Sequence, residues 1–346
     1  MASGLEGVVA AQTRLSHVDG ERGELVIAGE RVDALAGRQT FEQVCARLWG
    51  VAEVDLGPAR LWAFAQLPGL GRALALPDGM DALRAALAQL PADADALRVT
   101  AATGVFAAAW ARRREGRDAV EPEAKRPHAQ DVLRMVTGEV AAPLAAGLEA
   151  YLVSVIDHGM NASTFTARVI ASTGSDLVSA VTGAVGALKG PLHGGAPGPV
   201  LDMLDAVGAP ENAAAWLEAE LAAGRRIMGM GHRVYRVRDP RASVLERAVE
   251  RLERAGVSSR RLALARAVEQ VATKVLAQRY PDRSLQANVE FYTAVLLDTL
   301  GLPRQLFSPL FAVGRVAGWC AHFDEQQATG RLIRPASEYV GALPPG

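Results

Sequence analysis

The sequence predicts an all-α fold with a minor β-ribbon near the N-terminus. Apolar residues recur at helical spacing in one segment after another, and Gly or Pro ends most of these segments. No apolar run typical of a buried parallel strand separates them, so an alternating α/β architecture is not expected. Only residues 1–40, with short alternating pieces such as GELVIAGERV, have the period of strands.

Local signals place the helices of the first half of the chain. The segment FEQVCARLWG has Thr40 as a candidate N-cap, apolar residues at helical spacing and Gly50 as its stop. The segment MDALRAALAQL repeats this scheme, and a further helix is expected over residues 94–113. The charged, Pro-containing segment GRDAVEPEAKRPHAQ predicts a surface connection, after which helical pattern runs continuously over residues 131–154.

The second half continues the helical pattern around two Gly-rich turns, GPLHGGAPGP and MGMGH. SVLERAVERLERAG shows the pattern most clearly, with Leu245, Val249 and Leu252 on one face and Gly256 as its stop. Further helices are expected over residues 163–173, 176–188, 200–207 and 213–223, and in the segments RRLALARAVEQVATKVLAQRY, EFYTAVLLDTLG and LFSPLFAVGRVAGWCAHFDEQQ. A polar tail, RLIRPASEYVG, follows the last helix.

The composition argues against several classes of protein. With 37 basic and 38 acidic residues the net charge is −1, which gives no general attraction for nucleic acid or for an anionic membrane. Cys45 and Cys320 have neither the number nor the spacing of a disulfide framework or a metal site, so a reducing, cytoplasmic location is expected. No secretory leader is recognisable, and no apolar run reaches the roughly 18 residues of a membrane span.

Three side chains in separate segments suit proton abstraction next to a carbonyl group. His193 follows a helix break and precedes two glycines, which let a ligand approach the backbone closely. His232 lies among arginines in GMGHRVYRVRDPR, a setting that favours a neutral imidazole able to donate a hydrogen bond. Glu290 lies in an apolar stretch, and burial would raise its pKa toward the range of a general base. A structural role is the commoner explanation for each of them alone.

Three further residues are candidate substrate contacts. His158, in IDHGMNAST, is either a structural histidine paired with Asp157 or a contact for substrate. Asp239 begins a turn that would aim Arg241, whose forked guanidinium suits a carboxylate. Arg315 lies in the otherwise apolar segment FAVGRVAGW, and an arginine on an apolar helix face is expected to have an anionic partner.

Seven motifs occur in a fixed order along the chain: GLEGVVAAQTRLSHVDGERGEL, DHGMNASTFTARV, GALKGPLHGGA, IMGMGHRVYRVRDPRA, NVEFYTAVLLDTLGLP, LFAVGRVAGW and RLIRPASEYVG. Together they resemble the citrate synthase family over nearly the whole length. The resemblance implies a mostly helical homodimer in which each subunit has two domains and an active site in the cleft between them. The large, dimer-forming domain would comprise residues 1–195 and 292–346, and the small domain residues 196–291.

The resemblance also implies a role for each candidate residue. In this family a carboxylate, Glu290 by position, takes a proton from the methyl group of acetyl-CoA while His193 donates a hydrogen bond to the thioester oxygen. His232 polarises the ketone of oxaloacetate, and the citryl thioester that forms is then hydrolysed. The residues implied to hold the dicarboxylate are His158, Arg241, Arg315 and, from the tail of the other subunit, Arg334.

No metal and no permanently bound cofactor are implied, since acetyl-CoA is a co-substrate. Its contacts would include Arg225, Arg226 and Arg236, unless these form a solvated basic face. The family's usual base is Asp, and the extra methylene of Glu290 moves the carboxylate by about 1 Å. Thr293 also stands where Ser is usual. Two alternatives therefore remain beside citrate synthesis: a 2-methylcitrate synthase that uses propionyl-CoA, and a catalytically weak paralogue that binds oxaloacetate or CoA.

Overall fold

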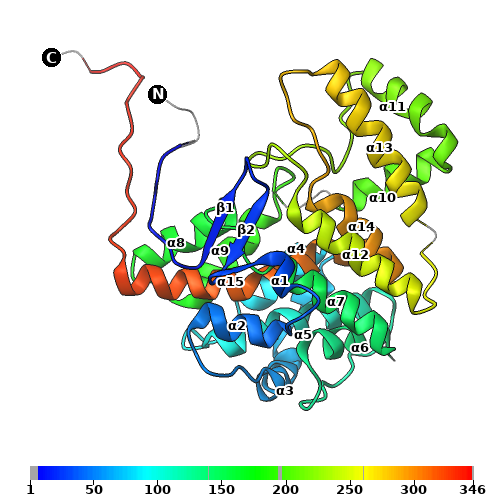
Figure 1. Cartoon of the computed structure of the whole chain (residues 1–346). Coiled ribbons are helices and arrows are strands. Elements are labelled where there is room, and N and C mark those ends of the chain that lie inside the picture. The colour runs from blue at the N-terminus through cyan, green and yellow to red at the C-terminus, as the bar shows by residue number, and fades with distance from the viewer. Residues whose placement is uncertain (1–6, 139, 194–196, 260, 345–346) are drawn as a thin grey trace.

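The computed structural model describes residues 7–138, 140–193, 197–259 and 261–344 and is dominated by helices (Figure 1). Its antiparallel sheet is the predicted N-terminal ribbon, formed by β1 (Ser16–Asp19), β2 (Glu24–Ile27) and β3 (Glu30–Arg31) in that order. The helices in the first part of the chain are α1 (Val32–Leu35), α2 (Phe41–Trp49), α3 (Gly57–Gln66), α4 (Gly79–Leu87), α5 (Ala96–Arg114), α6 (His128–Thr137) and α7 (Ala142–Val155). Those that follow are α8 (Ala162–Ser172), α9 (Leu177–Leu188), α10 (Pro197–Val207), α11 (Ala213–Ala222), α12 (Pro240–Arg254), α13 (Leu262–Arg279), α14 (Val289–Thr299) and α15 (Phe307–Thr329). The all-α prediction is confirmed.

Helix α2 begins and ends where its local signals predict. The Thr40 hydroxyl accepts a hydrogen bond from the Gln43 N–H at 3.2 Å, and the Gln43 side chain accepts one from the Thr40 N–H at 2.9 Å. This reciprocal capping box satisfies two backbone donors that the first turn leaves free. Gly50 ends the helix with φ of 67°, a conformation that glycine adopts without steric cost.

The prediction of one continuous helix over residues 131–154 is wrong. Helix α6 ends at Thr137 and α7 begins at Ala142. Gly138 has φ of 104°, and Pro143, which lacks an N–H, is tolerated in a first helical turn but not in the middle of a helix. Among the described residues no single helix is long and apolar enough to span a membrane; α6 and α7 meet that test together, but only as a sharply bent pair.

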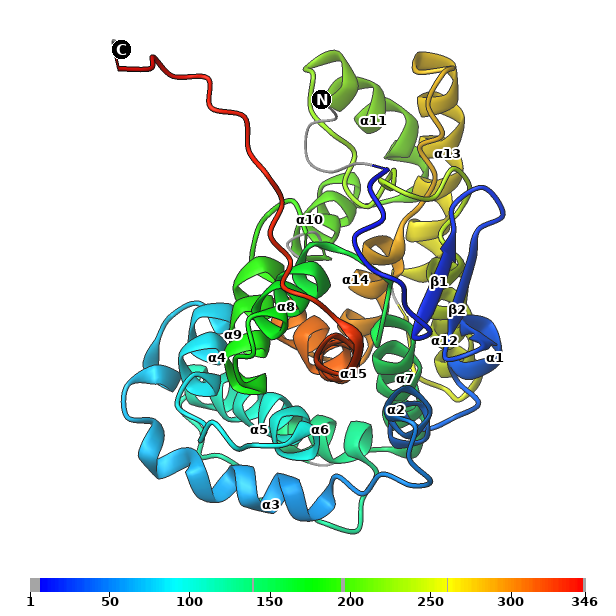
Figure 2. The same cartoon turned by 90° about the vertical axis from the view of Figure 1, so that its left-hand side faces the viewer.

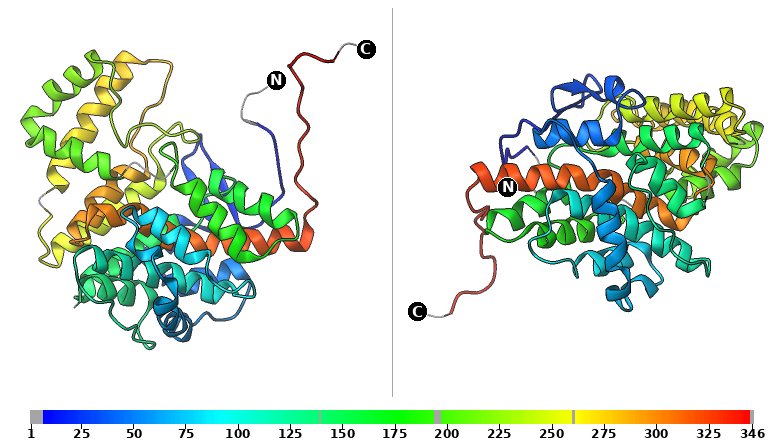
Figure 3. Two further views of the ribbon diagram at one scale, coloured as in Figure 1. Left: turned by 180° about the vertical axis from the view of Figure 1, so that it is seen from behind. Right: turned by 90° about the horizontal axis from the view of Figure 1, so that it is seen from below.

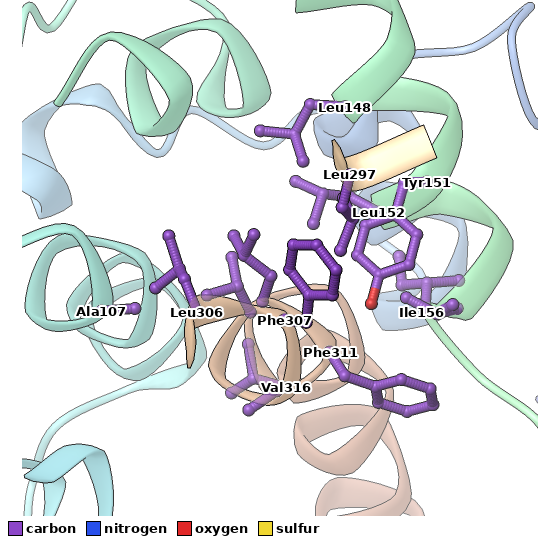
Figure 4. Close-up of a cluster of buried hydrophobic side chains, with 14 of the residues drawn as sticks. Ala107, Leu148, Tyr151, Leu152, Ile156, Leu297, Leu306, Phe307, Phe311 and Val316 are labelled. Carbon is purple, nitrogen blue, oxygen red and sulfur yellow. The ribbon is translucent and has the colours of Figure 1, made fainter. Parts of the chain in front are cut away.

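The hydrophobic core is built around α15, which runs through the middle of the bundle in Figure 2. It packs against α2, α4, α5, α7, α8 and α9. Figure 4 shows one part of this core, where Leu148 and Leu152 of α7 and Leu297 of α14 surround Phe307 of α15. All four side chains are buried. Helices α7, α14 and α15 are therefore held in a mutual position that sequence periodicity alone does not give.

Helices α10, α11 and α13 form a lobe to one side of this core, and α12 and α14 lie between the lobe and α7 (Figure 1). The lobe falls inside the predicted small domain, residues 196–291. Ala196 lies outside the described residues, and the division into two domains stays a prediction. After α15 the tail runs as an extended segment that leaves the body of the molecule (Figure 3).

Candidate active site

Three histidines from distant parts of the sequence meet between the core and the lobe. His158 follows α7, His193 follows α9, and His232 lies in the loop before α12. The imidazole centroids of His158 and His232 are 5.4 Å apart, and Tyr235 contacts both rings. The pKa of His158 lies well below its usual value because the ring is buried and because Arg241, His232, Arg315 and His193 are close enough to oppose a positive charge.

The loop around His232 determines which ring nitrogen carries the proton. Its Nδ1 accepts hydrogen bonds from the backbone N–H groups of Val234 and Tyr235, both at 3.0 Å. A backbone N–H can only donate, so Nδ1 is unprotonated and the proton of the neutral ring lies on Nε2. Burial, and next the charge of Arg241, lower the pKa of His232 to about 4. His232 is therefore a neutral donor at neutral pH, as its arginine-rich segment predicts.

The proton of His193 is placed by a helix end. Its Nε2 accepts from the backbone N–H of Ser163 at 3.3 Å and lies 2.8 Å from the Ser163 hydroxyl, in the first turn of α8. Since the N–H must donate, the ring proton lies on Nδ1. The positive end of the helix dipole disfavours a cationic imidazole there. Burial, followed by the charge of Arg315, lowers the pKa of His193 to about 4.

Glu290 is tied to the His232 loop through backbone pairing. Asn288 caps α14 by accepting from the Glu290 N–H at 3.0 Å, and its side-chain amide donates to the Gly231 carbonyl at 2.9 Å. The backbone N–H of Asn288 donates to Gly229, and Met230 forms a β-bridge with Ala287. The candidate base and His232 are therefore held by one paired segment, although 57 positions separate Asn288 from Gly231 in the sequence.

Glu290 is only 7% exposed. Burial raises its pKa to about 7; Arg241 and Arg315 oppose the rise, and Asp239 adds to it. Within the part of the chain that the structure describes, its Oε2 has no hydrogen-bond partner. A carboxylate that is half ionised near neutral pH has the basicity a general base needs, as its apolar sequence setting predicts.

Two buried arginines supply positive charge to this region. Arg241 donates from Nε and Nη2 to both carboxylate oxygens of Asp239, at 3.0 and 2.7 Å. Arg315 donates from Nε to the Val155 carbonyl at 2.5 Å, and its guanidinium lies over the Phe311 ring. In the described residues its Nη2 is buried without a partner. Among the described residues, therefore, no carboxylate is hydrogen-bonded to Arg315 as its expected anionic partner. Its Nη2 is available to a bound anion.

The pairing of His158 with Asp157, one of the two alternatives from the sequence, is wrong. His158 Nε2 instead lies 3.2 Å from the Tyr235 hydroxyl. Asp157 is bonded to Nε2 of His322 at 3.2 Å, and a buried network continues from that ring to Arg168. Neither Tyr235 nor His322 is indicated by sequence spacing, because each reaches its partner across helices that pack only in the folded chain.

Four of the predicted contacts are exposed; of these, Arg236 lies close enough to His232 for its charge to lower the pKa of that ring. Arg334 lies on the extended tail that follows α15. Arg225 forms an exposed ion pair with Glu220, and Arg236 donates to the Arg233 carbonyl at 3.4 Å. Arg226 is exposed as well. Among the described residues, no three His, Cys, Asp or Glu side chains lie where they could share a metal ion.

Comparisons with known proteins identify the family to which the chain belongs. The family profile described as "Citrate synthase, C-terminal domain" matches residues 4–336. The chain belongs to the citrate synthase family. It is 39% identical to the "Putative citrate synthase 2" of Mycobacterium tuberculosis over 99% of this chain and 93% of that protein. It is 38% identical to the 2-methylcitrate synthase of the same organism, over 98% and 90%.

Solved structures of this citrate synthase family have the same fold. Citrate synthase from Thermotoga maritima superposes with a TM-score of 0.87 at 34% identity, over 100% of this chain and 97% of that one. The ternary complex of citrate synthase from Thermoplasma acidophilum with carboxymethyl coenzyme A and oxaloacetate superposes with a TM-score of 0.89 at 26% identity, over 100% of this chain and 97% of that one. The recognition of the family from seven motifs is confirmed.

Proposed function

We propose that this protein condenses acetyl-CoA with oxaloacetate to give citrate and CoA. The observation that carries the proposal is that two neutral imidazoles, His193 and His232, occur together with one buried carboxyl, Glu290, whose pKa is about 7. In each imidazole a backbone N–H donor determines which ring nitrogen holds the proton. A weakly acidic carbon needs a base on the C–H bond and donors on the oxygen that gains charge, and these three groups supply both.

In the first step the Glu290 carboxylate removes a proton from the methyl carbon of acetyl-CoA, and the electron pair moves onto the thioester oxygen. His193 Nδ1–H donates a hydrogen bond to that oxygen as the enolate forms. The ring can do so because Ser163 already occupies its Nε2. A neutral imidazole stabilises the developing negative charge on the enolate oxygen by donating a hydrogen bond from its N–H group while it keeps that proton.

In the second step the enolate carbon attacks the ketone carbon of oxaloacetate, a C–C bond forms and the thioester C=O re-forms. The ketone π electrons move onto the ketone oxygen, which takes up one proton to become an alcohol and so balances the proton that Glu290 removed in the first step. His232 Nε2–H would polarise that ketone, because Nδ1 is held by Val234 and Tyr235. The two carboxylates of oxaloacetate would be held by His158, Arg241 and the free Nη2 of Arg315. Water then hydrolyses the citryl thioester and releases CoA.

A second candidate is 2-methylcitrate synthesis from propionyl-CoA, which the similarity to the 2-methylcitrate synthase of Mycobacterium tuberculosis favours. The chemistry is the same, and only the space for one extra methyl group differs. A methylene in a hydrophobic pocket changes selectivity by about 10- to 200-fold at most. Comparing kcat/KM for the two acyl-CoA donors decides between them.

The test is the rate of free thiol release from each acyl-CoA with and without oxaloacetate. We expect oxaloacetate-dependent release that falls at least 100-fold in Glu290→Gln, because the amide cannot accept the proton. Glu149→Gln is the matched control, since Glu149 is a partly buried carboxyl whose pKa desolvation raises to about 8, but it accepts a hydrogen bond from the Phe41 N–H instead. Native protein without turnover, and turnover appearing in Glu290→Asp, would identify a binding paralogue.

We also propose that the protein is a homodimer in which the tail places Arg334 in the site of the partner. Four large apolar side chains of the tail are exposed: Leu332, Tyr339, Val340 and Leu343. Tyr339 is 69% exposed and Val340 is 92% exposed. Apolar side chains on an extended segment that leaves its own subunit suit burial against a second copy (Figure 3).

Subunit mixing tests this arrangement. Arg334→Ala and His232→Ala are each expected to be inactive. A hybrid of the two has one site with an intact His232 and an Arg334 from the other subunit, so an equal mixture should recover about a quarter of the native activity. No recovery, with hybrids demonstrated by native mass spectrometry, would place Arg334 in its own subunit's site. Full activity of Arg334→Ala by itself would place Arg334 outside both sites.

The exposed arginines near the second Gly-rich turn are proposed contacts for the phosphates of CoA. Arginine forks bind phosphate well, but Arg225 must first leave Glu220, with which it forms an exposed ion pair. Replacing Arg225, Arg226 and Arg236 together by glutamine should raise KM for the acyl-CoA and leave KM for oxaloacetate unchanged. An unchanged KM for acyl-CoA would assign these residues to a solvated face.

A further inference from the structure

Four buried polar atoms in the region of Glu290 lack hydrogen-bond partners among the described residues. They are Glu290 Oε2, Thr293 Oγ1, Tyr151 Oη and Arg315 Nη2. They come from three helices, α14, α7 and α15, and Thr293 lies one helical turn after Glu290 on the same face. Buried polar groups are nearly always paired. Four unpaired groups in one place therefore indicate contacts that form in another state of the site.

The Tyr151 side chain is fully buried and its orientation is set by packing. Its ring lies against the apolar cluster in Figure 4, and its hydroxyl points away from Leu148 at the edge of that cluster. Burial raises the pKa of Tyr151 well above its ordinary value; the charge of Glu290 adds to the rise, and Arg315 and Arg241 oppose it. The phenol therefore stays protonated at every pH of interest and is available as a donor beside the candidate base.

We propose that Tyr151 is a positioning residue, whose phenolic O–H holds Oε2 of ionised Glu290 and leaves Oε1 to face the carbon acid. The inference rests on the proposed function of Glu290 as the base. A glutamate has one more side-chain torsion than an aspartate, so the backbone fixes the direction of its carboxylate less tightly and a hydrogen-bond partner is needed to hold it. Without such a partner the longer carboxylate is free to lie about 1 Å from the productive position, which costs about 100-fold in rate.

The charged groups around Glu290 do not replace this contact. Arg241 is already bonded through Nε and Nη2 to Asp239, and Arg315 through Nε to the Val155 carbonyl. Their remaining donors are the ones expected to hold the dicarboxylate. Tyr151 is the neutral donor that α7 contributes to the same region, and a neutral phenol orients a carboxylate without lowering its basicity as far as a guanidinium would.

The first test reads the carboxyl group directly and needs no turnover. Carbon-13 NMR of protein labelled at the glutamate side-chain carboxyl carbon, with the Glu290 resonance assigned by Glu290→Gln, gives its titration midpoint. In Tyr151→Phe this midpoint should rise by about one pH unit, because a hydrogen bond to the ionised form is lost. Tyr292→Phe is the matched control, since its buried hydroxyl donates to Glu269 Oε2 at 2.6 Å. An unchanged midpoint in Tyr151→Phe would overturn the proposal.

The second test uses kinetics in two backgrounds. Tyr151→Phe should lower kcat by up to about 100-fold, the cost of a misplaced carboxylate, and leave KM for oxaloacetate unchanged. In Glu290→Asp the shorter carboxylate does not reach the phenol, so adding Tyr151→Phe should have little further effect. Equal losses in both backgrounds, or a loss confined to KM for oxaloacetate, would show that Tyr151 does not act through Glu290. A native protein that never turns over refutes the proposed function but leaves the NMR result to decide the contact.

Discussion

Glu290→Gln keeps the size of the side chain and removes its ionisation, so it isolates what the buried carboxylate does to stability. The pKa of Glu290 rises from 4.5 to about 7 in the folded chain because of burial. Ionisation is therefore harder in the folded than in the unfolded protein. The resulting destabilisation is absent below about pH 4.5, grows between pH 4.5 and 7, and is complete above pH 7. A difference of about 2.5 pH units corresponds to about 3 kcal/mol.

Chemical denaturation of the native protein and of Glu290→Gln at several pH values measures this effect. The variant should gain stability over the native protein as the pH rises, by about 2.5 kcal/mol between about pH 5 and pH 8.5. Glu218→Gln, which replaces an exposed carboxylate on α11, is the control for the substitution itself. A gain that is independent of pH, or one that appears only in acid, would refute the reasoning from burial. The same variant is inactive in the proposed mechanism, so the site gives up stability for a base.

Three more predictions follow from the same geometry. The value of kcat/KM should rise about tenfold per pH unit up to about pH 7 as Glu290 ionises. Protonation of His193 or His232 should cause no additional loss of activity between pH 5 and 7, because the pKa values of both rings are about 4. Asp157→Asn should lower the unfolding free energy by about 2.5 kcal/mol at pH 7, because the pKa of Asp157 falls from 3.8 to about 2 in the folded chain. The native protein loses this stabilisation only as the pH falls from 3.8 through about 2, so denaturation of both proteins at pH 7 and at pH 3 should show a smaller difference at pH 3. Gly229→Ala should cost about 1–3 kcal/mol and lower kcat, since φ is +73° and a Cβ would lie within 3.0 Å of two neighbouring side chains; an unchanged melting temperature would contradict this.

Local sequence determined much of the helical structure. A cap needs only residues within one turn, which is why Thr40 and Gly50 locate both ends of α2 correctly. The same logic failed over residues 131–154, where apolar periodicity suggested one helix although Gly138 and Pro143 separate two. Helix α3 is absent from the prediction because no capping residue marks its start. Its N-cap is Leu56, whose side chain has no oxygen that could accept a hydrogen bond from the first turn.

The site shows where local information ends. Ordered motifs were enough to identify the family and to name His193, His232 and Glu290, because residue types and their immediate neighbours are written in the chain. The sequence alone did not determine that Ser163 places the proton of His193 or that Tyr235, rather than Asp157, contacts His158.

Those contacts join groups from different helices, and the packing of α7, α8, α14 and α15 brings them together. Their pKa values follow from burial, which is a property of the whole fold and of no single segment. The sequence thus determined which chemical groups this protein carries. Only the tertiary structure decided which of them meet, which nitrogen holds the proton and how strongly each group holds its charge, because these depend on distances across the folded chain.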